Sequence, residues 1–164
     1  MPSLFSFLSQ YFWLVALGIG IFNYVKARGA LGEREVTSAG QANEAEVYLK
    51  RFALGANLPW IVMGLGQITG YTPMVWYYFR PQDGNPFVIA WLAVALLITC
   101  TYSWWVLFKG GAEKVRDLNL MAALGQHRSK APSLLSIKLF AAFGPLFFPV
   151  WVYMVVHMNA PLPK

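Results

Sequence analysis

Long runs without a charged residue alternate with short polar segments along this chain. Four runs lack Asp, Glu, Lys and Arg: Met1 to Val25, Phe52 to Phe79, Phe87 to Phe108 and Leu139 to Pro163. Each run is long enough to cross a bilayer as a helix, which takes roughly 20 apolar residues. The pattern therefore predicts an all-α integral membrane protein, a four-transmembrane-helix bundle that forms one membrane domain over residues 1–164.

The expected spans cover about residues 11–25, 52–76, 87–108 and 134–156. Residues 29–43 are expected to form a polar loop that ends at Asn43, a helix cap with Glu46 three positions later. Residues 112–124 carry apolar side chains on one side and charged ones on the other. This pattern predicts a short interfacial amphipathic helix in the third connection, ended by Gly125.

The second span has the least regular sequence. Pro59 and Pro73 lack an amide hydrogen, so each is expected to kink the helix and to free carbonyls of the preceding turn. Inside a membrane, such carbonyls are tolerated where protein, water or a polar side chain meets them. Gly66 and Gly70 form a small-xxx-small motif, and Gly64 adds a further position without a side chain. These three glycines predict a close helix contact.

The distribution of basic residues predicts the orientation. Eleven of the thirteen cations flank the first and third connections: Lys26, Arg28, Arg34, Lys50, Arg51, Lys109, Lys114, Arg116, Arg128, Lys130 and Lys138. Arg80 and Lys164 lie on the other side. The positive-inside rule then places both long connections in the cytoplasm and the N- and C-termini outside. We expect the membrane to be the bacterial inner (cytoplasmic) membrane.

Composition agrees with a membrane protein. The chain is 57% hydrophobic and only 12% charged, whereas soluble proteins average about 25% charged residues. The net charge of +6 is carried in the connections and not along one exposed face, which argues against a nucleic-acid partner. Membrane lipids, with anionic headgroups on the cytoplasmic side, are the expected counter-charge.

The chain is poor in residues that hold metals or cofactors. Its two histidines, His127 and His157, are expected on opposite sides of the membrane, so no metal or haem site is predicted and no cofactor is expected. Cys100 is the sole cysteine and is expected to be a small buried apolar residue. The spans contain no acidic residue for a proton relay. A non-catalytic protein is favoured, although the sequence does not decide whether it is an enzyme.

One polar cluster is a candidate for binding. Lys50, Arg51 and Asn57 belong to the inner end of the second span, and Lys138 to the inner end of the fourth. Cations that converge there would bind an anion or a lipid headgroup. The alternative is that these long side chains only extend to the interface, where topology alone places cations.

A short internal similarity raises the question of duplication. The segments 50–55 and 138–144 both begin with lysine, contain Phe-Ala, end with glycine and precede a proline. Two hairpins in the same orientation would be related by a pseudo-two-fold axis along the membrane normal. Chance similarity between apolar segments is the alternative.

The run Asn57, Leu58, Pro59, together with four spans, a basic charge and a long first cytoplasmic connection, resembles the MAPEG superfamily of membrane glutathione transferases. That family has an Arg-Ala-x-x-Asn-x-x-Glu pattern just before the Asn-Leu-Pro region. Here Ala53 and Ala56 stand at its Asn and Glu. The resemblance covers about a quarter of the chain, and the thiol-binding residues do not carry over.

Three functions remain open. The first is a non-catalytic accessory or assembly subunit of a membrane complex or homo-oligomer, with other membrane subunits or copies of itself as partners. The second is a small transporter or channel with proline-broken helices. The third is the MAPEG-like glutathione transferase that the resemblance implies.

Overall fold

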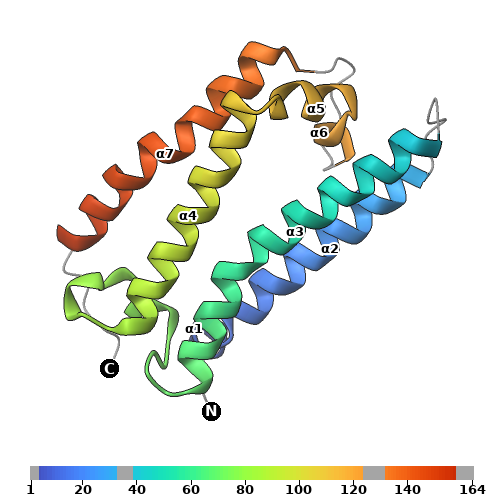
Figure 1. The fold of residues 1–164 in the computed structure, drawn as a ribbon. Coiled ribbons are helices and arrows are strands. Elements are labelled where there is room, and N and C mark those ends of the chain that lie inside the picture. The colour runs from blue at the N-terminus through green and yellow to red at the C-terminus, as the bar shows by residue number, and fades with distance from the viewer. Residues whose placement is uncertain (1–3, 33–38, 124–131, 158–164) are drawn as a thin grey trace.

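The computed structural model of the protein describes residues 4–32, 39–123 and 132–157, which form helices and no strand (Figure 1). The elements in chain order are α1 (Leu4–Gln10), α2 (Phe12–Gly32), α3 (Ala39–Ile68), η1 (Val75–Phe79), η2 (Pro81–Asp83), α4 (Pro86–Phe108), α5 (Gly111–Asp117), α6 (Leu120–Ala123) and α7 (Leu134–His157). The predicted all-α class is confirmed. Most of the described chain belongs to the four long helices α2, α3, α4 and α7.

Three of the long helices, α2, α4 and α7, are long and apolar enough to cross a membrane. Their length and composition support a membrane protein. The fourth long helix, α3, does not reach the same apolarity, because its apolar part begins only after Arg51 and contains Asn57 and Gln67.

The long helices pack in a row that follows the order of the chain. α2 contacts α3, α3 contacts α4, and α4 contacts α7, with neighbouring helices running in opposite directions (Figure 1). The two end members of the row, α2 and α7, make at most isolated contacts with each other among the described residues. A pseudo-two-fold axis relating the α2–α3 pair to the α4–α7 pair would turn the α3–α4 contact into an equivalent contact between α7 and α2. Because that second contact is nearly absent among the described residues, the packing does not show such an axis.

The short helices α5 and α6 join the two ends of the row. α5 packs against α4 and α7, whereas α6 packs against α2, and both lie between the C-terminal part of α2 and the adjoining ends of α4 and α7 (Figure 1). We call these two helices, residues 111–123, the roof. The roof therefore links the end members α2 and α7, which hardly touch directly.

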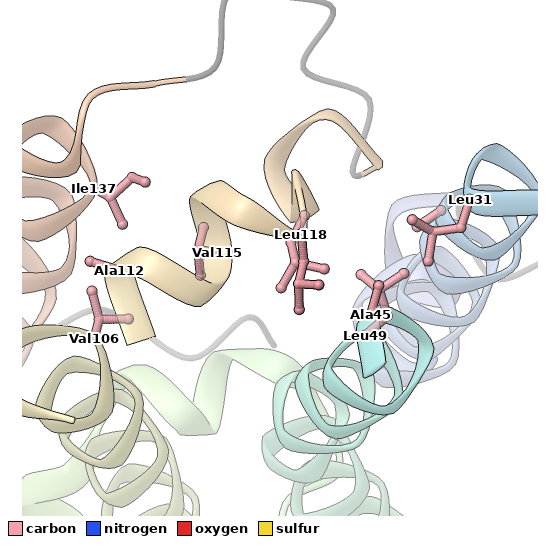
Figure 2. Packing of buried hydrophobic residues seen from close by; sticks show 10 residues of the cluster. Leu31, Ala45, Leu49, Val106, Ala112, Val115, Leu118 and Ile137 are labelled. Atoms are coloured by element: carbon pink, nitrogen blue, oxygen red, sulfur yellow. The ribbon is translucent and has the colours of Figure 1, made fainter. Parts of the chain in front are cut away.

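Apolar side chains of the roof attach it to the long helices. In Figure 2, Ala112 lies near Val106 of α4 and Ile137 of α7, while Leu118 extends toward Leu49 of α3. The buried cluster consists of Ala27, Leu31, Ala45, Leu49, Val106, Ala112, Val115, Leu118, Leu120 and Ile137. The amphipathic pattern predicted for residues 112–124 thus faces protein with its apolar side.

The predicted helix in this connection differs in one respect, because it is divided. Asn119 has a left-handed φ of 49° and separates α5 from α6. Asparagine tolerates this conformation better than most residues, since its short polar side chain bonds locally. Gly125, the predicted end of the helix, lies outside the described residues.

The second predicted span was placed too far along the chain. α3 ends at Ile68, and Gly70 follows it with a φ of +79°. Left-handed glycine just after a helix is a common way to end it. Pro73 and Trp76 therefore lie beyond α3, and Pro73 kinks no helix.

The first connection is shorter than expected. α2 continues to Gly32 and α3 begins at Ala39, so Asn43 is an interior helix residue and not the predicted cap. The physical reason is an apolar seam between α2 and α3 that continues past residue 25, the predicted end of the first span, with Ala27, Leu31 and Ala45 in the same buried cluster. Residues 33–38 of the predicted loop lie outside the described residues.

Candidate functional site

A cavity of about 530 Å³ lies among the long helices beneath the roof. Its lining comes from α2, α3, α4, α7 and the roof: Gly20, Asn23, Tyr24, Leu49, Phe52, Ala53, Ala56, Asn57, Thr99, Tyr102, Ser103, Val106, Val115, Leu120, Met121, Ile137, Phe140, Ala141 and Gly144. Its volume falls in the range of roughly 300–1,000 Å³ that is typical of small-molecule sites. The wall is almost wholly apolar.

Two adjacent residues of α4 tie that helix to both of its neighbours at the cavity wall. Tyr102 donates a hydrogen bond from its hydroxyl to the carbonyl of Arg51 on α3, at 2.7 Å. Ser103 donates from Oγ to the carbonyl of Ala141 on α7, also at 2.7 Å. Both hydroxyls are thus used in helix contacts, which leaves the wall apolar in character.

The Ser103 bond has a specific cause in the sequence. Pro145 lies four residues after Ala141 and has no amide hydrogen, so the Ala141 carbonyl lacks its normal helical donor. An unpaired carbonyl in a membrane interior is costly. The Ser103 hydroxyl replaces the missing donor from the neighbouring helix.

Asn57 packs its amide against α2. Its Nδ2 donates to the carbonyl of Ala53 at 2.7 Å, and its Oδ1 is buried without a hydrogen-bond partner in the described part of the chain. A Cβ added to Gly20 would collide with this amide. Glycine at position 20 therefore leaves the notch on α2 that the Asn57 side chain fills.

Another cavity-lining amide, Asn23 of α2, is exposed. Among the described residues the structure gives its side chain no hydrogen-bond partner. Asn23 also lies within the first charge-free apolar run, Met1 to Val25. Unlike the hydroxyls of Tyr102 and Ser103, it is a polar group of the lining that a bound molecule could reach without breaking a hydrogen bond between helices.

Aromatic rings pack between α3 and α4, and two of them, Phe52 and Tyr102, line the cavity. The ring of Phe52 lies 4.9 Å from that of Tyr102 and 5.7 Å from that of Trp105, centre to centre. Tyr48 lies 5.3 Å from Trp105. Such pairs hold large side chains in fixed positions, so this wall is built as a rigid surface.

The four residues predicted to bind an anion are not joined by any hydrogen bond or ion pair among the described residues. Asn57 lines the cavity, whereas Lys50 and Arg51 are exposed and do not line it. Lys138 Nζ lies 3.5 Å from Glu113 Oε1 of the roof. An anion at Lys138 would compete with this carboxylate, and anion binding at Lys50 and Arg51 stays a prediction.

Other charged residues near the roof pair across elements in the same way. Lys114 Nζ of the roof lies 2.6 Å from Glu44 Oε1 of α3, and Arg28 Nε of α2 lies 2.8 Å from Glu46 Oε1 of α3. The roof is thereby held by Lys114 to α3 and by Glu113 to α7. Because all these side chains are partly exposed, each pair contributes little energy on its own.

The ion pairs of the roof also shift two pKa values. The pKa of Glu113 is lowered, first by a hydrogen bond from its own backbone amide and then by the charge of Lys138. The pKa of Lys114 is raised by its hydrogen bond to Glu44 and by the charge of that carboxylate. Both shifts favour the charged forms, so these ties remain ionised over a wide pH range.

The three glycines predicted to pack helices occupy different environments. A Cβ on Gly64 would lie 2.6 Å from Cε3 of Trp13 on α2, and one on Gly66 would lie 2.5 Å from the hydroxyl of Tyr78. Gly70 is exposed beyond the end of α3 and has nothing within 4 Å of its Cβ position. The prediction that Gly66 and Gly70 together form one helix-packing motif is therefore wrong, because α3 ends before Gly70.

Among the described residues the structure assembles no site for metal or thiol chemistry. No group of three His, Cys, Asp or Glu side chains there could hold a metal ion. Cys100 is exposed on α4, which corrects the expectation of burial. His127 lies outside the described residues.

The sequence did not single out the residues that build the cavity, above all Tyr102 and Ser103. The signal for Ser103 was present as a hydroxyl in one apolar helix and a proline in the next. The roof was predicted as an amphipathic helix, but its apolar face was assigned to the headgroup layer. Its attachment to α2 and α7 depends on contacts that a pattern along one helix does not contain.

Comparison of the chain with protein-family models found no match, and comparisons with curated proteins and with solved structures found none either. The resemblance to the MAPEG superfamily therefore receives no support from these comparisons.

Proposed function

We propose that the protein is a four-span membrane protein that holds an apolar, lipid-like molecule in the cavity beneath the roof. In this proposal it acts as a non-catalytic accessory subunit of a bacterial inner-membrane complex or homo-oligomer. The observation that carries the binding function is the cavity itself, which combines about 530 Å³ of volume with an almost wholly apolar wall. A site of this size and polarity suits a hydrocarbon ligand.

The positions of the wall hydroxyls support binding over chemistry. Tyr102 and Ser103 already donate to backbone carbonyls of α3 and α7. To act on a substrate, either hydroxyl would have to give up its bond, and for Ser103 this would leave the Ala141 carbonyl unpaired at a cost of about 1–3 kcal/mol. Their role is to hold the walls of the cavity in place.

The proposed topology includes α3 as the second span. α3 packs between α2 and α4, which both have the length and apolarity of membrane helices. A helix held between two spans lies at the same depth as they do. With both termini outside, the roof is cytoplasmic, on the side where the basic residues are concentrated.

The test measures whether the purified protein retains an apolar molecule. Ala56 lines the cavity from α3 and is exposed, so Ala56→Trp would fill space without overpacking a core. Ala93 on α4 is also exposed but does not line the cavity. Ala93→Trp is therefore the matched control, with the same change in volume at a second exposed helical position.

Molecules extracted into organic solvent from the parent and both variants would be compared by liquid chromatography and mass spectrometry. We expect one class of apolar molecule to be retained by the parent and by Ala93→Trp, and to be lost from Ala56→Trp. Equal retention by all three proteins would contradict binding in the cavity.

A further inference from the structure

We propose that the occupant of the cavity is one acyl chain of a bilayer lipid, which enters sideways between α2 and α7. In this arrangement Asn23 hydrogen-bonds the ester linkage of the lipid at the entrance. The inference rests on the proposed function, since it names the class and the source of the molecule that the cavity holds.

The packing of the helices determines the side from which a molecule can enter. The wall is closed between α2 and α3, between α3 and α4, and between α4 and α7, because each of these pairs is in contact. The roof covers the cytoplasmic end with Val115, Leu120 and Met121. The remaining side lies between α2 and α7, which make at most isolated contacts among the described residues.

The residues at this side face the lipid as well as the cavity. Phe140 of α7 lines the cavity and is 77% exposed. Its neighbours on the same helix, Leu139 and Phe143, are also exposed. An apolar entrance between two membrane-spanning helices opens into the hydrocarbon of the bilayer and not into water.

Asn23 explains which part of the lipid lies at the entrance. Its amide lines the cavity, is exposed, and has no hydrogen-bond partner among the described residues. An amide left unpaired in hydrocarbon is unfavourable, because no water is available to satisfy it. The carbonyl of a glycerol ester accepts a hydrogen bond from such an amide.

The shape of the cavity suits a linear chain that runs along the helices. On α3 the lining extends from Leu49 to Asn57, which corresponds to about 12 Å at 1.5 Å per residue. The wall over this length contains aromatic and aliphatic side chains, and the hydroxyls of Tyr102 and Ser103 donate to backbone carbonyls. A hydrocarbon chain would lose no hydrogen bond by entering it.

The experiment uses the full chain in lipid nanodiscs of phosphatidylcholine that carries a photoreactive diazirine in the middle of one acyl chain. After irradiation, adducts are mapped by mass spectrometry. Val106 and Val115 line the cavity but are buried, so lipid around the outside of the protein cannot reach them. We expect adducts on these two residues in the parent and in Ala93→Trp, and their loss in Ala56→Trp.

Two substitutions at the entrance test the role of Asn23. Asn23→Leu removes the hydrogen bond, and Asn23→Gln retains an amide. We expect Asn23→Leu to lower the yield of adducts on Val106 and Val115 about fivefold, which corresponds to one hydrogen bond of ~1 kcal/mol. Asn23→Gln should keep most of the yield. Equal yields in all three proteins would overturn the assignment of Asn23.

A second sample carries the same diazirine chain as a free fatty acid at the same mole fraction. Stronger labelling of Val106 and Val115 by phosphatidylcholine is expected, and stronger labelling by the fatty acid would overturn the bilayer lipid as the source. If the extraction shows a molecule that depends on Ala56 but phosphatidylcholine leaves Val106 and Val115 unlabelled, this inference fails while the proposed function stands. If Ala56→Trp alters neither extraction nor labelling, both fail.

Discussion

Ser103 donates a 2.7 Å hydrogen bond to the carbonyl of Ala141, across the contact between α4 and α7. The bond joins two helices at the carbonyl that Pro145 leaves without an intrahelical donor. The proline and the serine are therefore one structural unit, although 41 residues separate them in the sequence. This relationship makes the stability of the α4–α7 contact testable by a pair of substitutions.

Ser103→Ala should lower the free energy of unfolding by about 1–3 kcal/mol, because it leaves a carbonyl unpaired in a membrane-spanning helix. In a Pro145→Ala background the same substitution should cost less, because residue 145 then supplies the backbone donor. Thermal or denaturant unfolding in detergent of the four proteins would give the coupling energy.

Thr99→Val is the matched control for Ser103→Ala. Thr99 also lines the cavity from α4, but its hydroxyl donates to Ala95 of its own helix at 2.8 Å. That carbonyl keeps its backbone donor, so loss of the hydroxyl should change stability little. If Ser103→Ala costs the same with and without Pro145, the proposed partnership is wrong.

Gly20 and Asn57 give a second prediction, at the contact between α2 and α3. Gly20→Ala would place a Cβ against the Asn57 amide and should destabilise the protein by about 1–3 kcal/mol, as overpacking usually does. Asn57→Ala should remove the collision, so the double variant should recover part of the loss. Unfolding in detergent is the measurement.

Gly18→Ala is the control, on the same helix and two residues away. Gly18 has nothing within 4 Å of its Cβ position, so alanine should be neutral there or stabilise the helix by about 0.5–1 kcal/mol. Equal effects of Gly18→Ala and Gly20→Ala would show that helix propensity, and not the Asn57 notch, determines the result.

The ion pair between Glu113 of the roof and Lys138 should weaken in acid. The pKa of Glu113 is lowered from 4.5, so its contribution to stability is fully present above that value and is lost as the pH falls through the lowered pKa. The pKa of Lys114 is raised from 10.5, so its contribution is present below 10.5 and is lost as the pH rises through the raised pKa. The roof should therefore be held best between these limits.

Melting temperature as a function of pH would measure this effect. Glu113→Gln should melt below the parent at pH 7, and the difference should disappear once acid protonates Glu113 in the parent. Asp117→Asn is the control, because Asp117 pairs with Arg116 on its own helix at 2.9 Å. A pH profile of Glu113→Gln parallel to that of the parent would contradict the role of the Glu113–Lys138 tie.

The helical class and the approximate positions of the apolar helices followed from the sequence, because charge-free length is a property of each segment alone. The ends of α3 did not follow. Its start depends on the apolar packing of Leu31 and Ala45 between α2 and α3, and its end on the left-handed conformation of Gly70. A single-sequence pattern does not give the start, since neighbours in space decide it. The end has a local signal in Gly70, because glycine commonly ends a helix in the left-handed conformation.

The candidate site followed even less from the sequence. Cations at the inner ends of the spans suggested an anion site, but Lys138 lies beside Glu113 of the roof, a carboxylate far from it in the chain. The cavity itself is made of ordinary apolar residues, with Asn57 as the one predicted site residue that lines it. Volume between helices depends on how they pack, and composition alone does not reveal it.

The proposed topology can be tested at four exposed positions, one at each end of the hairpins. Gln10 and Gln82 should lie outside the cell, whereas Gly40 and Lys109 should lie in the cytoplasm. Each would be replaced by cysteine in a Cys100→Ala background and treated with a membrane-impermeant thiol reagent on intact cells. We expect labelling of intact cells at residues 10 and 82, and labelling at residues 40 and 109 only after the membrane is opened, because the cations concentrate on the side of residues 40 and 109.

The decisive position is Gly40, because only a membrane-crossing α3 separates it from Gln82. If positions 40 and 82 are labelled alike, α3 does not span the membrane; if the whole pattern is reversed, the orientation is wrong and the roof faces outward.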